Sequence, residues 1–245
     1  MDDYKKILKI DGDNTKEYFL KSVYEKTQQQ LFLEKLLKNE NHEKNYKIAD
    51  VACGGGGLSY HLKNDVFPNA EFHLFDYLDD AIELAKQVNK ENDFNYYIDN
   101  IYDMKQASNF FDYVFCWQTL SWLDNPKQAL SELVRIAKSG GKIFASSLFN
   151  LDHDVDIYAK VLDHTKESSK DDIFGNYNTY SLYTIKNWLK GMVANFKIIP
   201  FNMDIDLMQN SRGIGTYTKK VTDSSERVQI SGGMLMNWGI LVITK

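Results

Sequence analysis

The stretch that decides the fold is Asp50-Val-Ala-Cys-Gly-Gly-Gly-Gly57, in which four consecutive glycines follow an apolar segment. Residues 47–53 form a predicted strand before the glycines, and residues 58–64 form a predicted short helix after them. Glycine permits the sharp turn between the two and lets a ligand approach the backbone, because no Cβ stands in the way. Since ligands bind at the carboxyl ends of strands in open α/β sheets, the stretch predicts a binding loop.

The same alternation of strand and helix continues beyond the glycines. The run 111–117 (FDYVFCW) is apolar nearly throughout, which suits a central parallel strand buried on both faces. Such alternation is typical of a mostly parallel sheet with helices on both faces. The other predicted strands are 71–76, 94–98 and 142–149, and the predicted helices are 79–89 and 126–138.

The segments that flank this core have other patterns. Residues 15–38 carry apolar residues at helical spacing, so they form a predicted N-terminal helix. After the core, the sequence predicts helices at 152–165 and 181–192 and strands at 196–207 and 235–244. No break in composition separates two domains, so we expect one domain over 1–245. Its parts are a helical segment (15–46), a core (47–150), a cap or insert (151–195) and C-terminal strands with a substrate-side insert (196–245).

Composition excludes several classes of protein. The 245 residues include 43% hydrophobic and 13% aromatic residues, which is enough for a packed core and argues against disorder. The net charge of −5 disfavours a nucleic-acid partner, because such partners are bound through their phosphates. Cys53 and Cys116 form no Cys-x-x-Cys pair, which argues against a zinc knuckle. No secretory signal or apolar span is present, so we expect a cytoplasmic protein without a membrane partner.

Carboxylates stand at the ends of the next two predicted strands. Asp76 ends the strand 71–76, and Asp99 follows the strand 94–98. A carboxylate at the first position can accept hydrogen bonds from both ribose hydroxyls of a nucleoside. One at the second position can accept from the exocyclic amino group of adenine. The alternative is that both aspartates only cap the helices that follow them.

These residues resemble the class I S-adenosylmethionine-dependent methyltransferases. Asp50-x-Ala52-x-Gly54-x-Gly56 is similar to the glycine-rich motif of that family, with alanine where its first glycine usually stands. Asp76 resembles the ribose-binding acid of the family, and Asp99-Asn100-Ile101 resembles its adenine motif. The likeness extends through the fourth strand and the turn before the fifth, and so covers roughly residues 46–150.

The resemblance implies a Rossmann-like, doubly wound α/β fold. Its sheet would have seven strands, mostly parallel with an antiparallel last strand. The activity implied is in-line methyl transfer from S-adenosyl-L-methionine, which leaves S-adenosyl-L-homocysteine. The cofactor contacts implied are Asp50, Ala52, Gly54, Gly56, Asp76, Tyr77, Asp99, Asn100, Ile101, Cys116, Trp117 and Tyr24.

The resemblance also implies roles for these residues. Asp50 would order the glycine loop and the methionyl amino group, and Tyr77 would pack on the adenine. Cys116 and Trp117 would lie near the methionyl part of the cofactor. Tyr24, on the predicted N-terminal helix, would close over the cofactor, unless it is only a partly buried aromatic residue.

Candidate substrate contacts come from segments beyond the fourth and fifth strands. They are Gln118, Trp122, Tyr177, Tyr180, Arg212 and Tyr217. Tyr177 and Tyr180 would line the pocket if 166–180 forms a lid. Arg212 could bind a phosphate or carboxylate with paired hydrogen bonds, or it could lie in a glycine-rich turn with solvated charges.

His153 is the candidate general base, because histidine titrates near neutrality. The alternative is a solvated helix start. The run Asp152-His153-Asp154 could also suggest a metal site. Metal-dependent relatives carry an aspartate at the end of the fourth strand, where this chain has Trp117-Gln118, so we predict no metal.

The predicted methyl acceptor is a small molecule, such as an anionic metabolite or a sugar or phosphate derivative, methylated on oxygen or nitrogen. None of the three prolines is adjacent to another, so the Pro-Pro-aromatic motif of DNA amino-methylating enzymes is absent. One alternative is an NAD-dependent short-chain-type oxidoreductase. Against it, Gly54-x-Gly56-x-x-Ser59 lacks the third glycine of the dinucleotide fingerprint. The other alternative is a non-enzymatic nucleoside-binding module.

Overall fold

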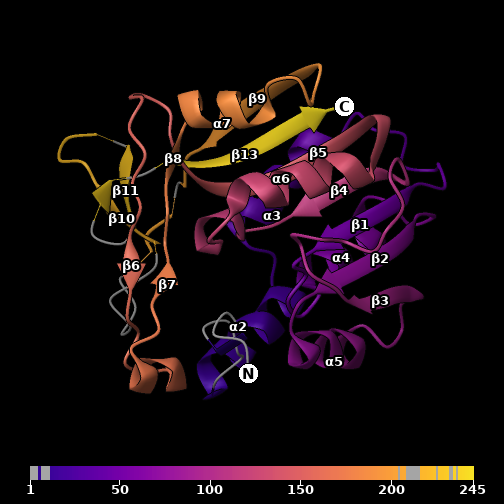
Figure 1. Ribbon diagram of the computed structural model, residues 1–245, viewed down its shortest axis with the longest axis horizontal. Coiled ribbons are helices and arrows are strands. Elements are labelled where there is room, and N and C mark those ends of the chain that lie inside the picture. The colour runs from indigo at the N-terminus through magenta and orange to yellow at the C-terminus, as the bar shows by residue number, and fades with distance from the viewer. Residues whose placement is uncertain are drawn as a thin grey trace.

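The centre of the protein is one sheet whose main strands lie in the order β3-β2-β1-β4-β5-β13-β9 (Figure 1). The computed structural model describes residues 5–6, 12–203, 205–207, 216–224, 226–231, 234–235 and 237–245. The strands of the sheet are β1 (Lys47–Val51), β2 (Glu71–Asp76), β3 (Phe94–Ile98), β4 (Phe111–Cys116), β5 (Ala137–Asn150), β9 (Asn195–Phe201) and β13 (Asn237–Thr244).

Strand directions confirm the predicted α/β fold. β1 pairs in parallel with β2 and β4, and β5 pairs in parallel with β4. β13 is antiparallel to both of its neighbours, β5 and β9. A two-residue strand that was not predicted, β8 (Tyr180–Ser181), pairs in parallel with the last two residues of β5.

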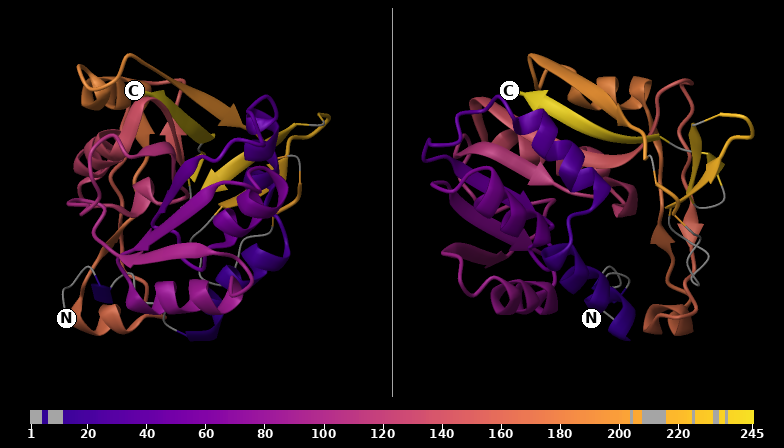
Figure 2. Two further views of the ribbon diagram at one scale, coloured as in Figure 1. Left: turned by 90° about the vertical axis from the view of Figure 1, so that its right-hand side faces the viewer. Right: turned by 180° about the vertical axis from the view of Figure 1, so that it is seen from behind.

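Two apolar cores hold helices against the two faces of the sheet (Figure 2). Strand side chains alternate between the faces, so Val114 belongs to one core and its neighbour Phe115 to the other. The first core includes Leu133 of α6 and Leu189 of α7, and the second includes Leu33 of α3. The helices are α3 (Gln28–Leu37), α4 (Gly57–Asp65), α5 (Asp79–Val88), α6 (Pro126–Ile136) and α7 (Leu182–Leu189).

The predicted N-terminal helix is two helices, α2 (Gly12–Tyr24) and α3. The break has a local cause, because Thr27 forms a capping box at the start of α3. The Thr27 hydroxyl accepts from the Gln30 N–H at 3.2 Å, and the Thr27 N–H donates to Gln30 Oε1 at 2.7 Å. Apolar residues stand on both sides of the break, but residues 25–30 are all polar, and this interruption is the sequence signal of the break.

The predicted helix at 152–165 is wrong. This segment contains turns and the short strand β6 (Lys160–Val161), which pairs with β7 (Gly175–Asn176). Tertiary hydrogen bonds fix it, because Asp156 accepts from the Ser181 N–H at 2.7 Å and from the Thr184 hydroxyl at 2.5 Å.

A second small sheet stands beside the main one, together with β6 and β7 (Figures 1 and 2). Its strands are β10 (Thr216–Lys220), β11 (Arg227–Ser231) and β12 (Met234–Leu235). The 3₁₀ helices η1 (Leu120–Trp122) and η2 (Glu167–Asp171) flank this region. We call residues 151–181 the insert, because α7, which the sequence grouped with this segment, packs in the first apolar core of the main sheet.

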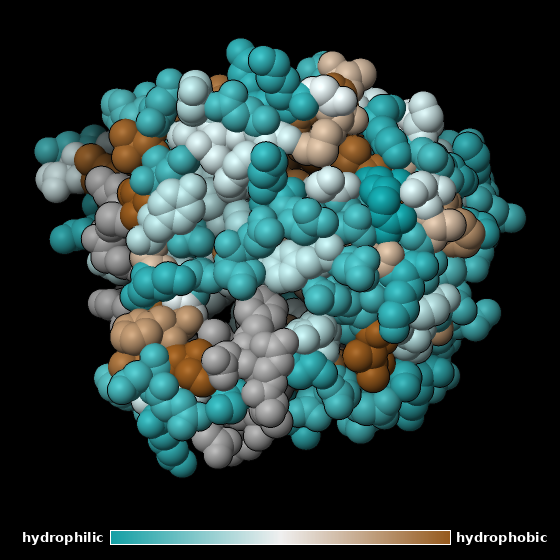
Figure 3. All heavy atoms as spheres, in the orientation of Figure 1, coloured by the Kyte–Doolittle hydropathy of each residue, from teal (hydrophilic) through white to brown (hydrophobic). Residues whose placement is uncertain are grey.

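Hydrophilic side chains predominate on the face shown in Figure 3, with apolar ones in small separate groups. Scattered apolar residues are ordinary on a protein surface. Within the described ranges, no helix has both the length and the apolar character needed to cross a membrane. The larger apolar surface lies instead inside a cavity between the main sheet and the insert.

Candidate active site

This cavity has a volume of about 820 Å³. The carboxyl ends of β1, β2, β3 and β4 form one side, and the others come from α2, the insert, Met203, Ile205 and Leu207. Its volume is near the upper end of the range for small-molecule sites, so it has room for two ligands side by side. The predicted residues that line it are Ala52, Gly54, Asp76, Tyr77, Asp99, Asn100, Ile101, Trp117, Gln118, Trp122 and Tyr177.

The glycine loop turns where the sequence predicted. Ala52 and Gly54 have positive φ angles of 59° and 54°, and both line the cavity. Gly56 also has a positive φ, 73°, but it does not line the cavity. A Cβ on Gly56 would lie 2.8 Å from the amide nitrogen of Asn89. Gly56 therefore serves the close packing of the loop on α5, and the prediction that it contacts the cofactor is not supported.

Asp76 and Asp99 organise the backbone and also line the cavity. Asp76 Oδ2 accepts from the Gly54 N–H and Oδ1 from the Leu78 N–H, both at 2.9 Å. Asp99 Oδ1 accepts from the Asn100 N–H at 2.9 Å, and Oδ2 accepts from the Lys105 N–H at 3.0 Å. A carboxylate oxygen has two lone pairs, so each aspartate can accept further bonds from a ligand. Neither aspartate caps a helix, because the N-cap of α5 is Leu78 without a side-chain cap hydrogen bond and residues 100–110 contain no helix. Holding the backbone and binding a ligand are compatible roles for both.

A smaller cavity of about 70 Å³ adjoins the large one beside the glycine loop. Asp50 and Trp117 both line it. Asp50 is buried, and its Oδ2 accepts from the Ser59 hydroxyl at 2.7 Å. Asp50 Oδ1 and Trp117 Nε1 are buried without a hydrogen-bond partner among the described residues. An unpaired acceptor and an unpaired donor beside one cavity suit a ligand end that carries both an ammonium and a carboxylate group.

Burial makes the Asp50 carboxyl hard to ionise. Its pKa is raised to about 7, chiefly by burial and further by the negative charge of Asp76, while the Ser59 hydrogen bond lowers it. Burial also raises the pKa of Asp76, against the effect of its backbone hydrogen bonds. A cationic group bound beside these carboxylates would stabilise their charged forms.

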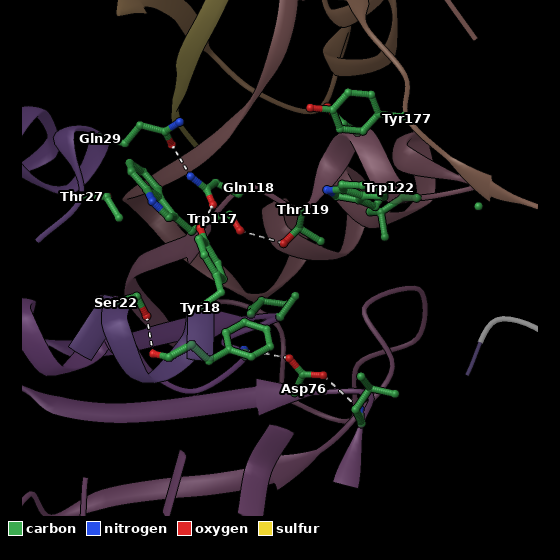
Figure 4. Close-up of a pocket in the computed structure, with 18 of the residues that line it drawn as sticks. Tyr18, Ser22, Thr27, Gln29, Asp76, Trp117, Gln118, Thr119, Trp122 and Tyr177 are labelled. Carbon is green, nitrogen blue, oxygen red and sulfur yellow. Dashed lines mark hydrogen bonds between the residues drawn. The ribbon is translucent and has the colours of Figure 1, made fainter. Parts of the chain in front are cut away.

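Helix α2 brings residues to the cavity that the sequence did not single out as site residues, among them Tyr18 and Phe19. The Tyr18 hydroxyl donates to Gln118 Oε1 at 2.7 Å, and Gln118 Nε2 donates to Gln29 Oε1 at 3.0 Å (Figure 4). The Phe19 ring covers the loop so closely that a Cβ on Gly54 would lie 2.4 Å from it.

Tyr24, which was predicted for this role, is 77% exposed and does not line the cavity. Helical geometry explains the difference. Positions 18 and 24 are six residues apart, which is a rotation of roughly 240° on a helix, so they cannot share a face. The sequence pattern predicted a helix here, but it did not predict which face of the helix points to the cavity.

Cys116 and Tyr180 belong to the apolar core and not to the cavity. Alternation along β4 turns Cys116 away from the side of Trp117, so Cys116 is fully buried. This burial raises the pKa of its thiol to about 12. Tyr180 is also fully buried, and its hydroxyl donates to the Leu120 carbonyl at 3.0 Å. The formation of β8 directs Tyr180 inward, whereas Tyr177 stays at the cavity.

The remaining predicted residues lie elsewhere. Tyr217 follows Thr216 in β10, and alternation leaves Thr216 at the cavity and Tyr217 away from it. His153 is exposed in a turn after β5, outside the cavity, so it is not positioned as a general base. Arg212 lies outside the described residues. No cluster of three potential metal ligands forms within the described ranges.

The fold and this site define a class I S-adenosylmethionine-dependent methyltransferase. The order of the strands, the antiparallel β13, and the glycine loop with acids at the next two strand ends together set this class apart. Residues 42–192 match the model of a family described as a methyltransferase domain, and this match covers more than half of the chain. The chain belongs to this methyltransferase family.

Named relatives are methyltransferases too. The chain is 26% identical over 183 residues to malonyl-[acyl-carrier protein] O-methyltransferase 2 of Ilyobacter polytropus, with 72% of this chain and 68% of the relative covered. It is 31% identical over 101 residues to the malonyl-[acyl-carrier protein] O-methyltransferase of Hahella chejuensis, with 41% and 36% covered. The chain thus spans between about a third and two thirds of the length of these relatives.

A solved structure with a similar fold is phosphoethanolamine N-methyltransferase 2 of Haemonchus contortus in complex with S-adenosyl-L-methionine. The TM-score is 0.63 at 15% identity, with 100% of this chain and 60% of that chain covered. At this identity the likeness supports the fold alone.

Proposed function

We propose that the protein binds S-adenosylmethionine in the large cavity and transfers its methyl group to oxygen or nitrogen of a small-molecule acceptor. One observation carries the proposal: three adjacent strand ends bring Gly54, Asp76 and Asp99 to a single cavity. The unpartnered Asp50 oxygen beside that cavity supports it further.

The donors and acceptors of the site complement the parts of this cofactor. Asp76 would accept from the ribose hydroxyls, and Asp99 from the adenine amino group. In the smaller cavity, Asp50 would accept from the ammonium group and the Trp117 indole would donate to the carboxylate. These contacts would also satisfy the two buried polar atoms that have no partner among the described residues.

When bound, the cofactor supplies an electrophilic methyl group on a sulfonium whose leaving group is neutral. The contribution of the chain is therefore mainly alignment, and proximity and orientation can supply much of the rate. Gln118 stands at the boundary of the two cavities and is held from several directions. Its backbone has a φ of 55°, and its N–H donates to the Ser146 hydroxyl at 2.7 Å. We assign Gln118 to the positioning of the reacting groups.

Calorimetry tests the proposal directly. S-adenosylhomocysteine is expected to bind with micromolar affinity, and NAD is expected to give no binding heat at the same concentration. Binding of NAD without binding of the product nucleoside would favour the oxidoreductase alternative. Product binding without methylation of any acceptor probe would favour the non-enzymatic module.

Replacing Tyr18 by phenylalanine is expected to lower the affinity for S-adenosylhomocysteine by about 3- to 10-fold. The change removes the hydroxyl that donates to Gln118, and one hydrogen bond contributes about 0.5–1.5 kcal/mol. Tyr24→Phe is the matched control, since it removes the same atom from the same helix at an exposed position. Equal affinities in the two variants would show that Tyr18 does not support the cofactor site.

A further inference from the structure

Beyond the predicted cofactor contacts, the cavity is lined by an aromatic pair, Trp122 and Tyr177, and by a group of aliphatic and methionine side chains. This inference rests on the proposed function and names the class of acceptor. We infer that the acceptor is an uncharged molecule with an aromatic body and a hydroxyl or amino group, bound between the Trp122–Tyr177 pair and an apolar wall. Anionic sugar or phosphate derivatives do not fit this part of the cavity as well.

The apolar wall consists of side chains from three separate segments. They are Leu123, Val161, Ile173, Met203, Ile205 and Leu207. Several of them, including Ile173 and Leu207, are only partly buried and so keep apolar surface open to the cavity. A ligand that covers this surface gains free energy from removing it from water, at about 25 cal/mol per Å². A sugar phosphate has little apolar surface, so it would gain less free energy from contact with this wall.

The aromatic pair faces this space from the side of η1. The rings of Trp122 and Tyr177 have centroids 4.7 Å apart and lie side by side in Figure 4. Main-chain hydrogen bonds hold the pair in place. The Tyr177 N–H donates to the Ala159 carbonyl at 3.0 Å, and the Asn178 N–H donates to the Ser121 carbonyl at 2.8 Å. Fixed aromatic rings favour stacked or edge-on contact with another ring.

Charges at the described part of the cavity disfavour an anion. Two of the lysines form ion pairs: Lys21 Nζ lies 3.6 Å from Glu25 Oε2, and Lys26 Nζ lies 2.7 Å from Glu34 Oε1. Lys166, the third lysine of the described lining, also has an interaction partner. An anionic acceptor would therefore compete with partners that these lysines already have. It would also meet the carboxylates that line the same cavity, such as Asp163.

A matched pair of probes tests the inference on protein saturated with S-adenosylhomocysteine. The neutral probe is 2-naphthol, and 2-naphthyl phosphate has the same ring with an anionic group. Ribose 5-phosphate is an anion without an aromatic body. Calorimetry is expected to show binding of 2-naphthol, at least 10-fold weaker binding of 2-naphthyl phosphate, and none of ribose 5-phosphate. Tighter binding of either phosphate would overturn the inference.

Tyr177→Ala is expected to weaken 2-naphthol binding by about 5- to 10-fold while the affinity for S-adenosylhomocysteine stays unchanged. Tyr183→Ala is the matched control, because Tyr183 is 59% exposed and does not line the cavity. Ile173→Asn, at a partly buried position of the apolar wall, is a second variant with the same expected loss, should Tyr177→Ala fail to fold.

The two proposals fail in different ways. If S-adenosylhomocysteine binds but 2-naphthol does not, the inference is overturned and the proposed function stands. Unchanged 2-naphthol affinity in both Tyr177→Ala and Ile173→Asn also overturns the inference alone. If S-adenosylhomocysteine does not bind, the proposed function fails, and the inference fails with it.

Discussion

Replacement of Asp76 by alanine is expected to weaken the binding of S-adenosylhomocysteine by roughly 100-fold, or about 2.7 kcal/mol. Two losses add up in this variant. The carboxylate proposed to hold the ribose hydroxyls disappears, and the Gly54 and Leu78 N–H groups lose the acceptors that now lie 2.9 Å away. The Gly54 N–H, at the part of the glycine loop that lines the cavity, then loses the side chain that fixes it.

Asp80→Ala is the control for this experiment. Asp80 is an exposed carboxylate at the start of α5, four residues along the chain, and it does not line either cavity. Its removal is expected to leave the affinity within about twofold, since exposed charges near a helix start contribute only a few tenths of a kcal/mol. Circular dichroism and melting curves establish that both variants fold. Full affinity in a folded Asp76→Ala variant would place the ribose elsewhere.

The meeting of the strand-end residues at one cavity could be predicted because topology fixes their positions. Asp76 and Asp99 directly end or follow strands, and parallel strands bring their carboxyl ends to one edge of the sheet. No knowledge of side-chain packing was needed for this step. The exceptions follow the same logic: Gly56 and Cys116 are near the right strand ends, but one serves loop packing and the other faces the core.

The acceptor half could not be predicted in the same way. Its residues come from η1, from loops and from segments beside short strands of two to five residues, where a shift of one position exchanges the two faces. Tyr177 lines the cavity, whereas Tyr180 and Tyr217 do not, although all three are tyrosines between polar neighbours in the sequence. The pairing of β6 with β7 sets which side chains face the cavity, and that pairing depends on contacts distant in the sequence.

Asp50 to asparagine is expected to lower the affinity for S-adenosylhomocysteine by roughly 100-fold while making the free protein more stable. The bound ammonium would lose the carboxylate that balances its charge in a buried position, and breaking a buried ion pair on one side is costly. In the free protein, the same carboxyl is buried with one oxygen that has no described partner. Asparagine keeps the shape of the side chain and removes the buried charge.

The pH dependence of S-adenosylhomocysteine binding to the wild-type protein should report the ionisation of the Asp50 carboxyl. Its pKa of about 7 means that the carboxyl carries a proton over much of the neutral range, and only the ionised form balances an ammonium. Affinity is therefore expected to rise about tenfold between about pH 6 and about pH 8. The neighbouring Cys53 thiol stays neutral across this range, because burial raises its pKa well above the usual value. Comparison with Asp50→Asn separates Asp50 from Asp76, whose pKa burial also raises.

Stability should change with pH in the opposite direction to affinity. The folded protein holds the Asp50 proton more tightly than the unfolded chain, where the pKa is near 3.8. The contribution of this group to the free energy of unfolding therefore falls as the pH rises from about 4 to about 7, and it is constant above that. Melting curves of the free proteins are expected to place Asp50→Asn about 3–6 °C above wild type at about pH 8, with a smaller difference at about pH 5. A variant that melts below wild type at both pH values, or wild-type affinity that does not change with pH, would show that Asp50 is not the buried anion of the cofactor site.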